Sequence, residues 1–361
     1  MVGRIKPDAQ ERRPLPKRWI LDGSRDIAEA SSKASQVEPV LLVDNLSVAF
    51  PYRKSWLEAV RGVSFQLAPG ETLALVGESG SGKSVTSSAV MGLIDPPARV
   101  TADRMLFEGK PLPTHSESEW RKLRGHSLSM IFQDPMTALN PLLKIGEQVI
   151  EPFQIHQGKD RTSARLEALA WLSKVGLSQP DRVFASYPHQ LSGGMRQRVV
   201  IAMALCCRPS LVIADEPTTA LDVTVQAQIL KLLRSLQDEV GMAVLLITHD
   251  LGVVEEQAHR VAVCYNGQVV ETATCEELFS NPRHPYTRGL LDSIPRLDRP
   301  VGKLPSIPGT PPGLHEPLSG CPFQPRCGQR LDRCALEAAP VIEDVRCWLL
   351  EKEATVESTA G

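Results

Sequence analysis

The sequence predicts an α/β fold organised around a phosphate-binding loop, and three observations favour this class. Residues 77–84 match the pattern G-x-x-x-x-G-K-[ST] at every fixed position. An apolar run at residues 72–76 precedes the loop as a buried strand would, and a helix is expected over residues 85–93. Two further strand-like runs, residues 211–216 and 243–247, flank a helical pattern. Strands that alternate with helices are typical of a sheet covered by helices.

The chemistry of such a loop follows from its residue types. Glycines allow the backbone to fold around an anion, so that successive N–H groups point at phosphate oxygens. The N-terminus of the following helix adds partial positive charge. Lys83 would reach the β- and γ-phosphates, and Ser84 would bind Mg²⁺ through its hydroxyl. The alternative is a glycine-rich turn with a chance lysine, which the flanking strand and helix disfavour. The predicted nucleotide-binding residues are Gly77, Ser79, Gly80, Gly82, Lys83, Ser84 and Val85.

Three runs before the loop, at residues 40–43, 46–50 and 59–67, have the composition of strands. An aromatic ring at the end of an early strand can stack on a nucleobase. Phe50 is the first candidate for this role, and Tyr52 is the second. Packing of Phe50 in the hydrophobic core is an equally good interpretation.

Composition sets limits on the kind of protein. A chain of 361 residues can hold one large domain and a smaller one, and its net charge of −2 favours no nucleic-acid partner. No apolar run approaches the roughly 18–20 residues needed to cross a bilayer, and the first residues lack the core of a signal peptide. We therefore expect neither a secreted nor a membrane-spanning chain, although docking on a membrane protein stays open. Residues 1–39 are expected to form a flexible polar tail.

The strand at residues 211–216 ends in two adjacent carboxylates, Asp215 and Glu216. Their burial costs desolvation free energy unless they bind a cation or handle a proton. Asp215 suits Mg²⁺ bound through water, and Glu216 suits a base that positions or deprotonates an attacking water. The alternative is a strand that simply emerges into solvent.

Two more polar residues lie just after predicted strands. Gln133 follows an apolar strand at residues 127–132, and its side-chain oxygen could bind Mg²⁺ or a bound water. His249 follows the strand at residues 243–247, where it would face the ligand crevice of an open α/β sheet. Taken alone, Gln133 is better explained as an exposed polar residue and His249 as a structural histidine.

A second helix N-terminus suited to an anion is expected at Ser192, which occupies an N-cap position before Gly193 and Gly194. One chain offers no second phosphate for it, so the ligand is expected to belong to a partner subunit. The alternative is an ordinary capped helix. Asp222 is predicted to cap the next helix, which Gly241 ends.

The order and spacing of these residues make residues 40–288 resemble the ATPase subunit of an ABC transporter. By this resemblance, Gln133 is the Q-loop residue and His249 the switch histidine. Met195 replaces the glutamine usual in the signature, whose phosphate-binding part is intact. The remaining motifs by resemblance are the Walker A loop (77–84), the signature (191–195, with Ser192, Gly193 and Gly194), the Walker B strand (211–216) and the D-loop (220–222, with Asp222).

The resemblance implies an ABC-type ATPase domain at residues 40–290. This fold has a RecA-like mixed-sheet core, an antiparallel β subdomain and a helical subdomain, here at about residues 141–208. ATP and Mg²⁺ are the implied ligands. Glu216, His249 and Gln133 would act in catalysis, Mg²⁺ would be bound by Ser84, Gln133 and Asp215, and the signature helix of a partner would complete the site.

Two later stretches narrow the resemblance. Residues 281–291 and the tail that begins at residue 320 are similar to oligopeptide and dipeptide transporter ATPases. The implied partners are a homologous second ATPase, two membrane subunits and a substrate-binding protein, at the cytoplasmic face of the inner membrane. Importers of nickel, glutathione or sugar fragments have similar ATPases, so the solute stays open. Two other classes are disfavoured: a soluble ABC ATPase acting on DNA or ribosomes, because the chain lacks heptads and a basic excess, and a non-catalytic regulatory subunit, because Glu216 and His249 are present.

The chain has eight cysteines, and four of them lie in a predicted C-terminal extension at residues 291–361 with the spacing C-x₅-C-x₆-C-x₁₂-C. Four thiolates could hold a metal centre that staples a segment too small for its own core. The resemblance implies a [4Fe–4S] cluster on Cys321, Cys327, Cys334 and Cys347. Zinc is an alternative, although its usual close C-x₂₋₄-C pairs are absent, and free or oxidised thiols are another. The other four cysteines, Cys206, Cys207, Cys264 and Cys275, are expected to be free thiols.

Overall fold

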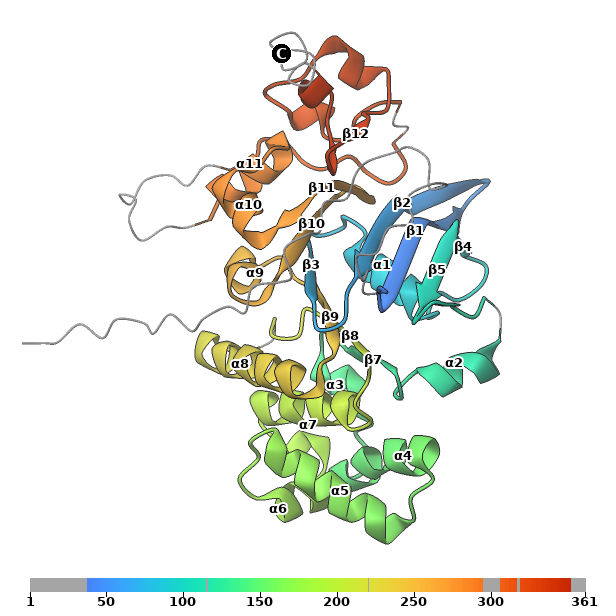
Figure 1. The fold of residues 1–361 in the computed structure, drawn as a ribbon, viewed down its shortest axis with the longest axis vertical. Coiled ribbons are helices and arrows are strands. Elements are labelled where there is room, and N and C mark those ends of the chain that lie inside the picture. The colour runs from blue at the N-terminus through green and yellow to red at the C-terminus, as the bar shows by residue number, and fades with distance from the viewer. Residues whose placement is uncertain (1–37, 115, 220, 295–305, 317–318, 352–361) are drawn as a thin grey trace, which may run out of the picture. The chain divides into compact units, whose positions relative to one another are not determined.

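The computed structural model describes residues 38–114, 116–219, 221–294, 306–316 and 319–351 (Figure 1). The predicted flexible tail lies outside the described residues apart from its last two positions. The described part contains two β-sheets with helices packed around them. No helix in these ranges is long and apolar enough to cross a membrane.

The larger sheet positions the functional loops. Its strand order is β12-β13-β11-β10-β3-β9-β8-β7, and the five strands from β10 to β7 run parallel. β3, β8 and β9 are buried at every residue, as expected for parallel strands covered on both faces. The bounds are β3 Thr72–Val76, β7 Leu128–Ile131, β8 Leu211–Asp215, β9 Ala243–Ile247, β10 Arg260–Tyr265, β11 Gln268–Thr274, β12 Val341–Ile342 and β13 Val345–Arg346.

Side chains of β8 alternate between two hydrophobic clusters. Leu211 and Ile213 belong to the cluster that holds β1 (Leu41–Tyr52) and helix α1 (Lys83–Val90). Val212 and Ala214 belong to the cluster that holds α7 (Gly193–Leu205) and α8 (Val223–Val240). The period of two along the strand therefore buries both faces at once.

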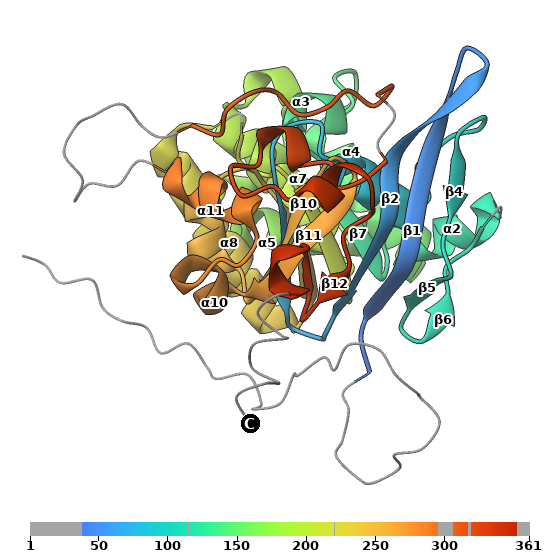
Figure 2. The ribbon, with the colours of Figure 1, turned by 90° about the horizontal axis from the view of Figure 1, so that it is seen from above.

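The smaller sheet is antiparallel and has the order β2-β1-β5-β6, with β4 paired to β1. The two strand runs predicted at residues 40–43 and 46–50 form one strand, β1, whose register against β2 shifts between Val43 and Ala49. A bulge in the interval between the two runs, where Asn45 has φ +53°, lets the strand continue through it. Figure 2 shows the long β1–β2 hairpin beside the larger sheet. The bounds are β1 Leu41–Tyr52, β2 Ser55–Leu67, β4 Arg99–Thr101, β5 Arg104–Phe107 and β6 Lys110–Pro111.

Helices α4, α5 and α6 are grouped beside α7 (Figure 1). The amphipathic helix predicted at residues 162–175 is α5, and Asp160 caps it by accepting a hydrogen bond from the Ser163 backbone N–H at 2.7 Å. α4 is nearly as long as α5, and α2, α3 and α6 are shorter. The bounds are α2 Glu117–Leu123, α3 Pro135–Ala138, α4 Ile145–Gln157, α5 Arg161–Lys174 and α6 Pro180–Ala185.

The C-terminal part is joined to the larger sheet. The hairpin predicted at Asn266-Gly267 connects β10 to β11, and both turn residues have the positive φ angles that this turn requires. β13 then pairs with β11 through Val345 and Glu271. The remaining helices are α9 (Leu251–Gln257), α10 (Cys275–Ser280) and α11 (Pro285–Asp292).

Candidate active site

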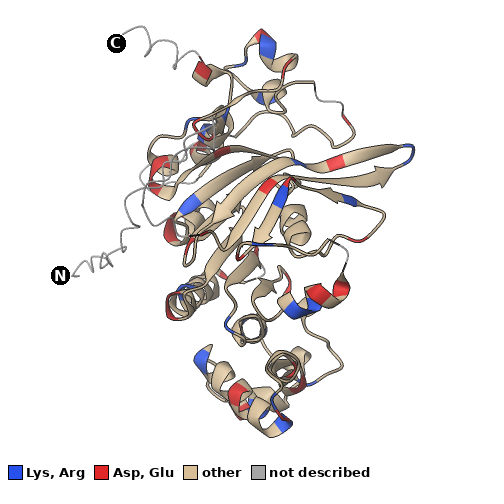
Figure 3. Cartoon of the chain, turned by 45° about the vertical axis from the view of Figure 1, so that its right-hand side comes forward, with Lys and Arg blue, Asp and Glu red and all other residues tan. Residues whose placement is uncertain are grey.

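The candidate active site lies where the parallel strands end. β3, β9, β8 and β7 are direct neighbours in that order, so the residues that follow them meet at one edge of the sheet. The phosphate loop follows β3, His249 follows β9, Glu216 follows β8 and Gln133 follows β7. Lysine and arginine are interspersed with acidic residues over the described elements, so neither sign of charge dominates the cartoon (Figure 3).

Two glycines allow the phosphate loop to lie against the neighbouring backbone. Gly77 has φ +150°, and a Cβ there would stand 2.1 Å from the carbonyl oxygen of Cys264. Gly82 has φ +97°, and its Cβ would stand 2.6 Å from the carbonyl oxygen of Ala59. Backbone atoms cannot give way as a side chain can, so both positions require glycine.

Lys83 folds back onto its own loop. Its Nζ donates hydrogen bonds to the carbonyl oxygens of Gly77 at 2.8 Å and Glu78 at 3.0 Å, and to Ser81 Oγ at 3.3 Å. Burial lowers the pKa of Lys83, against the opposing influence of nearby acidic groups. The amine therefore lies at the inner side of the loop, where a bound phosphate would be held.

Ser84 and Asp215 form the predicted magnesium pair. Ser84 Oγ donates a hydrogen bond to Asp215 Oδ1 at 3.1 Å. Burial raises the pKa of Asp215, the bond from Ser84 opposes this, and the charge of Glu216 adds to it. A hydroxyl and a carboxylate side by side are the oxygen donors that Mg²⁺ prefers, so these residues fit the ion.

Glu216 is the centre of a hydrogen-bond network. Its Oε2 accepts from Gln133 Nε2 at 2.8 Å and from Thr219 Oγ1 at 3.0 Å, while its Oε1 lies 3.0 Å from His249 Nδ1. Burial tends to raise the pKa of Glu216, but the bonds from His249 and Thr219 and the charges of His249 and Lys83 outweigh it, and the pKa is lowered. The backbone of Glu216 has φ +46°, an uncommon left-handed conformation for glutamate that often marks a functional position.

Sequence reasoning brought together Gln133, Glu216 and His249 and missed Thr219. The sequence signal for Thr219 would have been its position three residues after Glu216, in the turn that follows β8. A cavity of about 440 Å³ lies at this network, so the space for a ligand is beside the predicted catalytic residues. Its lining residues are Gly77, Glu78, Ser79, Gln133, Glu216, His249, Leu251 and Leu290.

Six of the eight nucleotide contacts predicted at residues 50–85 lie outside this cavity lining: Phe50, Gly80, Gly82, Lys83, Ser84 and Val85. Phe50 packs against the hydrophobic cluster that contains β1, which agrees with core packing rather than with stacking on a base. Tyr52, the second candidate for stacking, is 45% exposed. Val85 of α1 also packs against that cluster. A Cβ on Gly80 would meet nothing within 4 Å, and Gly80 lines a second, smaller cavity.

The signature residues lie at the start of α7. Ser192 caps this helix by accepting from the Met195 backbone N–H at 3.3 Å, and a Cβ on Gly194 would stand 2.8 Å from a Val225 methyl group. Asp222 caps α8 by accepting from the Val225 N–H at 3.0 Å. The two helix starts thus pack together. Ser192, Gly193, Gly194 and Asp222 are not part of the lining of the 440 Å³ cavity.

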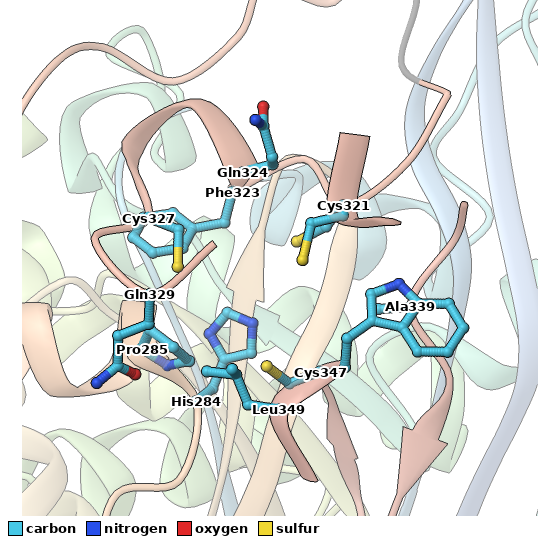
Figure 4. A pocket seen from close by; sticks show the side chains of 12 residues that line it. His284, Pro285, Cys321, Phe323, Gln324, Cys327, Gln329, Ala339, Cys347 and Leu349 are labelled. Carbon is cyan, nitrogen blue, oxygen red and sulfur yellow. The ribbon is translucent and has the colours of Figure 1, made fainter. Parts of the chain in front are cut away.

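The four C-terminal cysteines line one small cavity of about 20 Å³. Figure 4 shows this cavity, with Cys321, Cys327 and Cys347 labelled. No disulfide joins cysteines within the described residues. Burial, together with the neighbouring thiols, raises the pKa of Cys321 to about 11 and also raises that of Cys327 and Cys347. As these side chains lie, no group of three or more His, Cys, Asp or Glu residues in the described ranges forms a metal site. The structure therefore gathers the thiols without arranging them as ligands.

Comparison with known proteins shows which families this chain matches. Residues 60–219 match the family described as ABC transporter, and residues 270–334 match the oligopeptide/dipeptide transporter C-terminal region. The second match covers three of the four clustered cysteines.

The individual proteins that are similar to this chain agree with these family matches. The chain is 52% identical to a dipeptide transport ATP-binding protein of Bacillus subtilis over 88% of this chain and 97% of that one. It is 50% identical to the Escherichia coli dipeptide transport ATP-binding protein over 82% and 91%. A dimeric ATP-binding cassette solved with ADP and phosphate aligns with 29% identity and a TM-score of 0.58, over 65% of this chain and 98% of that one. The predicted fold class is confirmed, and the chain belongs to the ABC transporter ATPases, in the group that carries the oligopeptide/dipeptide transporter C-terminal region.

Proposed function

We propose that this chain is the ATPase subunit of an ABC importer that takes up di- or oligopeptides. The observation that carries the catalytic part is the Glu216 network, which lines the 440 Å³ cavity together with residues of the phosphate loop. The names of the relatives, which are dipeptide and oligopeptide transport ATP-binding proteins, support the peptide substrate.

In this proposal the loop binds the phosphates of ATP. Its N–H groups and the Lys83 amine meet the β- and γ-phosphates, and Mg²⁺ is held by Ser84 and Asp215 with Gln133 as a further ligand. When bound, Mg²⁺ supplies neutralisation of phosphate charge. Gln133 donates its amide N–H to Glu216, which leaves its side-chain oxygen for the ion or its water.

Glu216 positions the attacking water and accepts its proton. The water forms a new P–O bond to the γ-phosphorus while the bond to the bridging oxygen of ADP breaks. A lowered pKa keeps Glu216 ionised near neutral pH, as a hydrogen-bond acceptor for the water must be. His249 contacts Glu216 through Nδ1, which leaves its other ring nitrogen available to face the γ-phosphate.

The substitution Glu216→Gln tests the assigned base. It removes the carboxylate while keeping the size of the side chain, so ATP binding is expected to persist and hydrolysis to fall about 10²-fold or more. The measurements are the affinity for a fluorescent ATP analogue and the release of phosphate by the assembled transporter. Glu276→Gln, an exposed position in α10, is the matched control. Near-normal turnover in Glu216→Gln would contradict the role.

A second ATPase subunit is expected to complete the site. Ser192, Gly193 and Gly194 open a 13-residue helix whose N-terminus suits a phosphate, yet they do not line the cavity of their own chain. The solved cassette that holds ADP and phosphate is a dimer, which supports the same arrangement here. We therefore infer that each chain presents its signature to the nucleotide of a homologous partner.

Ser192→Asp separates this hypothesis from a purely local helix cap. Aspartate caps a helix as well as serine does, but its charge would repel the γ-phosphate of the partner's ATP. Hydrolysis by the assembled transporter is expected to fall about tenfold or more, while the isolated chain keeps its ATP affinity. The control is Ser163→Asp, which adds the same charge to the first turn of α5. Unchanged hydrolysis would exclude the composite site.

The partners proposed beyond the ATPases are two membrane subunits and a substrate-binding protein, with this chain bound at the cytoplasmic face of the membrane. An apolar groove of about 240 Å³ supports a docking role next to Gln133, because it contains the 42% exposed ring of Phe132. Movement of Gln133 with its ligand would then be transmitted to whatever occupies the groove. Other lining residues include Met91, Leu93, Met130 and Met203.

Isolation of the whole complex tests partners and solute together. We expect the chain to co-purify with two membrane proteins and the bound solute to be a peptide, identified by mass spectrometry. Phe132→Ser is expected to weaken co-purification, whereas Leu336→Ser, at a residue 73% exposed in the C-terminal segment, is not. A metal ion or glutathione as solute would replace the peptide assignment, and nucleic acid without membrane proteins would refute the transport assignment.

A [4Fe–4S] cluster on Cys321, Cys327, Cys334 and Cys347 is proposed as a structural staple of the extension. The support is that the four thiols line one cavity, and thiolates are the ligands that iron–sulfur clusters and zinc both accept. The thiol side chains would have to turn toward a common centre, because their present arrangement is not a metal site.

Metal analysis of anaerobically purified protein distinguishes the alternatives. Iron with matching sulfide is expected, and Cys321→Ser or Cys347→Ser should lower both, because a cluster of this type takes four thiolates. Cys207→Ser, outside the extension, is the control. Zinc without iron would support the zinc alternative, and protein free of both metals would leave the four residues as thiols.

A further inference from the structure

The second residue of the phosphate loop is held by groups from the distant C-terminal part. The Glu78 backbone N–H donates to Tyr286 Oη at 3.0 Å. Its carboxylate accepts two hydrogen bonds from one guanidinium, Arg326 Nη1 at 2.6 Å and Arg326 Nη2 at 3.0 Å. Glu78 and Arg326 are 248 residues apart in the sequence.

Arg326 is fixed by further contacts. Its side chain is only 4% exposed, and Nε donates to the carbonyl oxygen of Pro308 at 2.9 Å. Nη1 also contacts Tyr265 Oη at 3.3 Å, and Nη2 contacts the carbonyl oxygen of Ile307 at 3.5 Å. A planar guanidinium with this many partners has one orientation, and a bidentate pair in that orientation is specific for a carboxylate.

The extension also covers one side of the loop. A cavity of about 40 Å³ separates the loop from a proline-containing stretch, and its lining includes Ser79 and Gly80 on one side and Pro311, Pro312 and Leu314 on the other. Arg326 ends a short 3₁₀ segment, Gln324–Arg326, directly before Cys327. The phosphate loop and the cysteine-bearing segment are therefore joined through one ion pair.

Charge gives this ion pair a function. Glu78 places a negative charge within the loop that must accept the negative phosphates of ATP, and an unpaired carboxylate there would oppose binding. Arg326 neutralises that charge and holds the Glu78 carboxylate next to the extension. The pair is mostly buried, so solvent screens it less than a surface pair.

We propose that Arg326 is a positioning residue for ATP binding, which acts by neutralising and orienting Glu78 so that the C-terminal extension sets the charge of the phosphate loop. This inference rests on the proposed function, because it concerns the same nucleotide.

The test compares variants of the full chain by their affinity for Mg-ATP. Arg326→Met is expected to bind about tenfold more weakly, since it leaves the Glu78 charge unpaired beside the phosphates. Arg326→Lys keeps the charge and should stay within about threefold of wild type. Glu78→Gln combined with Arg326→Met should return close to wild-type affinity, because the opposing charge is gone.

Arg333→Met is the matched control. Arg333 also directly precedes a clustered cysteine, Cys334, and it pairs with Glu351 within the extension, away from the loop. It should alter thermal stability without altering the affinity for Mg-ATP. A merely structural role for Arg326 would lower the melting temperature in the same way and leave affinity unchanged, which would overturn the proposal.

The remaining outcomes separate a failure of the proposed function from a failure of the role proposed for Arg326. Lys83→Met must lose affinity if the loop binds ATP, so wild-type affinity in that variant would refute the proposed function itself. Loss in Lys83→Met with no loss in Arg326→Met would refute only the role of Arg326. If Arg326→Met does not fold, Arg326→Lys and the single variant Glu78→Gln still decide. A tenfold loss of affinity in either would contradict the charge argument.

Discussion

Everything in the candidate site depends on the pairing of four buried parallel strands. β3, β9, β8 and β7 are hydrogen-bonded neighbours, so the residues that follow each strand meet at one edge. A slip of one residue between strands would turn every side chain to the opposite face, and the close packing of the hydrophobic cluster on that face opposes such a slip. The contacts between Ser84 and Asp215, and between Glu216 and its three partners, are consequences of this register.

The two adjacent carboxylates of β8 acquire different properties from different surroundings. Asp215 is buried, with one hydroxyl as its partner, and its pKa is raised. Glu216 receives hydrogen bonds from three side chains, and its pKa is lowered despite burial. Environments that separate the pKa values of neighbouring acids are typical of sites where each has its own role. The proposed roles also differ, with Asp215 facing Mg²⁺ and Glu216 facing the attacking water.

The phosphate loop is held from two sides by different physical means. On one side, Gly77 and Gly82 let it lie directly against backbone carbonyl groups of other strands. On the other side, Tyr286 and Arg326 bind Glu78 through hydrogen bonds and charge. The C-terminal part is also packed into a shared hydrophobic cluster with Tyr265, Tyr286 and Phe323. The extension is therefore structurally continuous with the nucleotide site.

The sequence by itself determined the features that local physics decides. The loop glycines, the helix caps at Ser192 and Asp222, and the buried strands can be read from neighbouring residues, because backbone conformation and hydrophobic period act over a few positions. Parallel strands further implied that Gln133, Glu216 and His249 would share an edge. Only the tertiary structure decided that Thr219 joins Glu216, that Phe50 packs in the core, that four cysteines line one cavity and that Arg326 binds Glu78. These contacts form between distant segments, or between side chains of a turn, only once the chain has folded. No local sequence pattern predicts them.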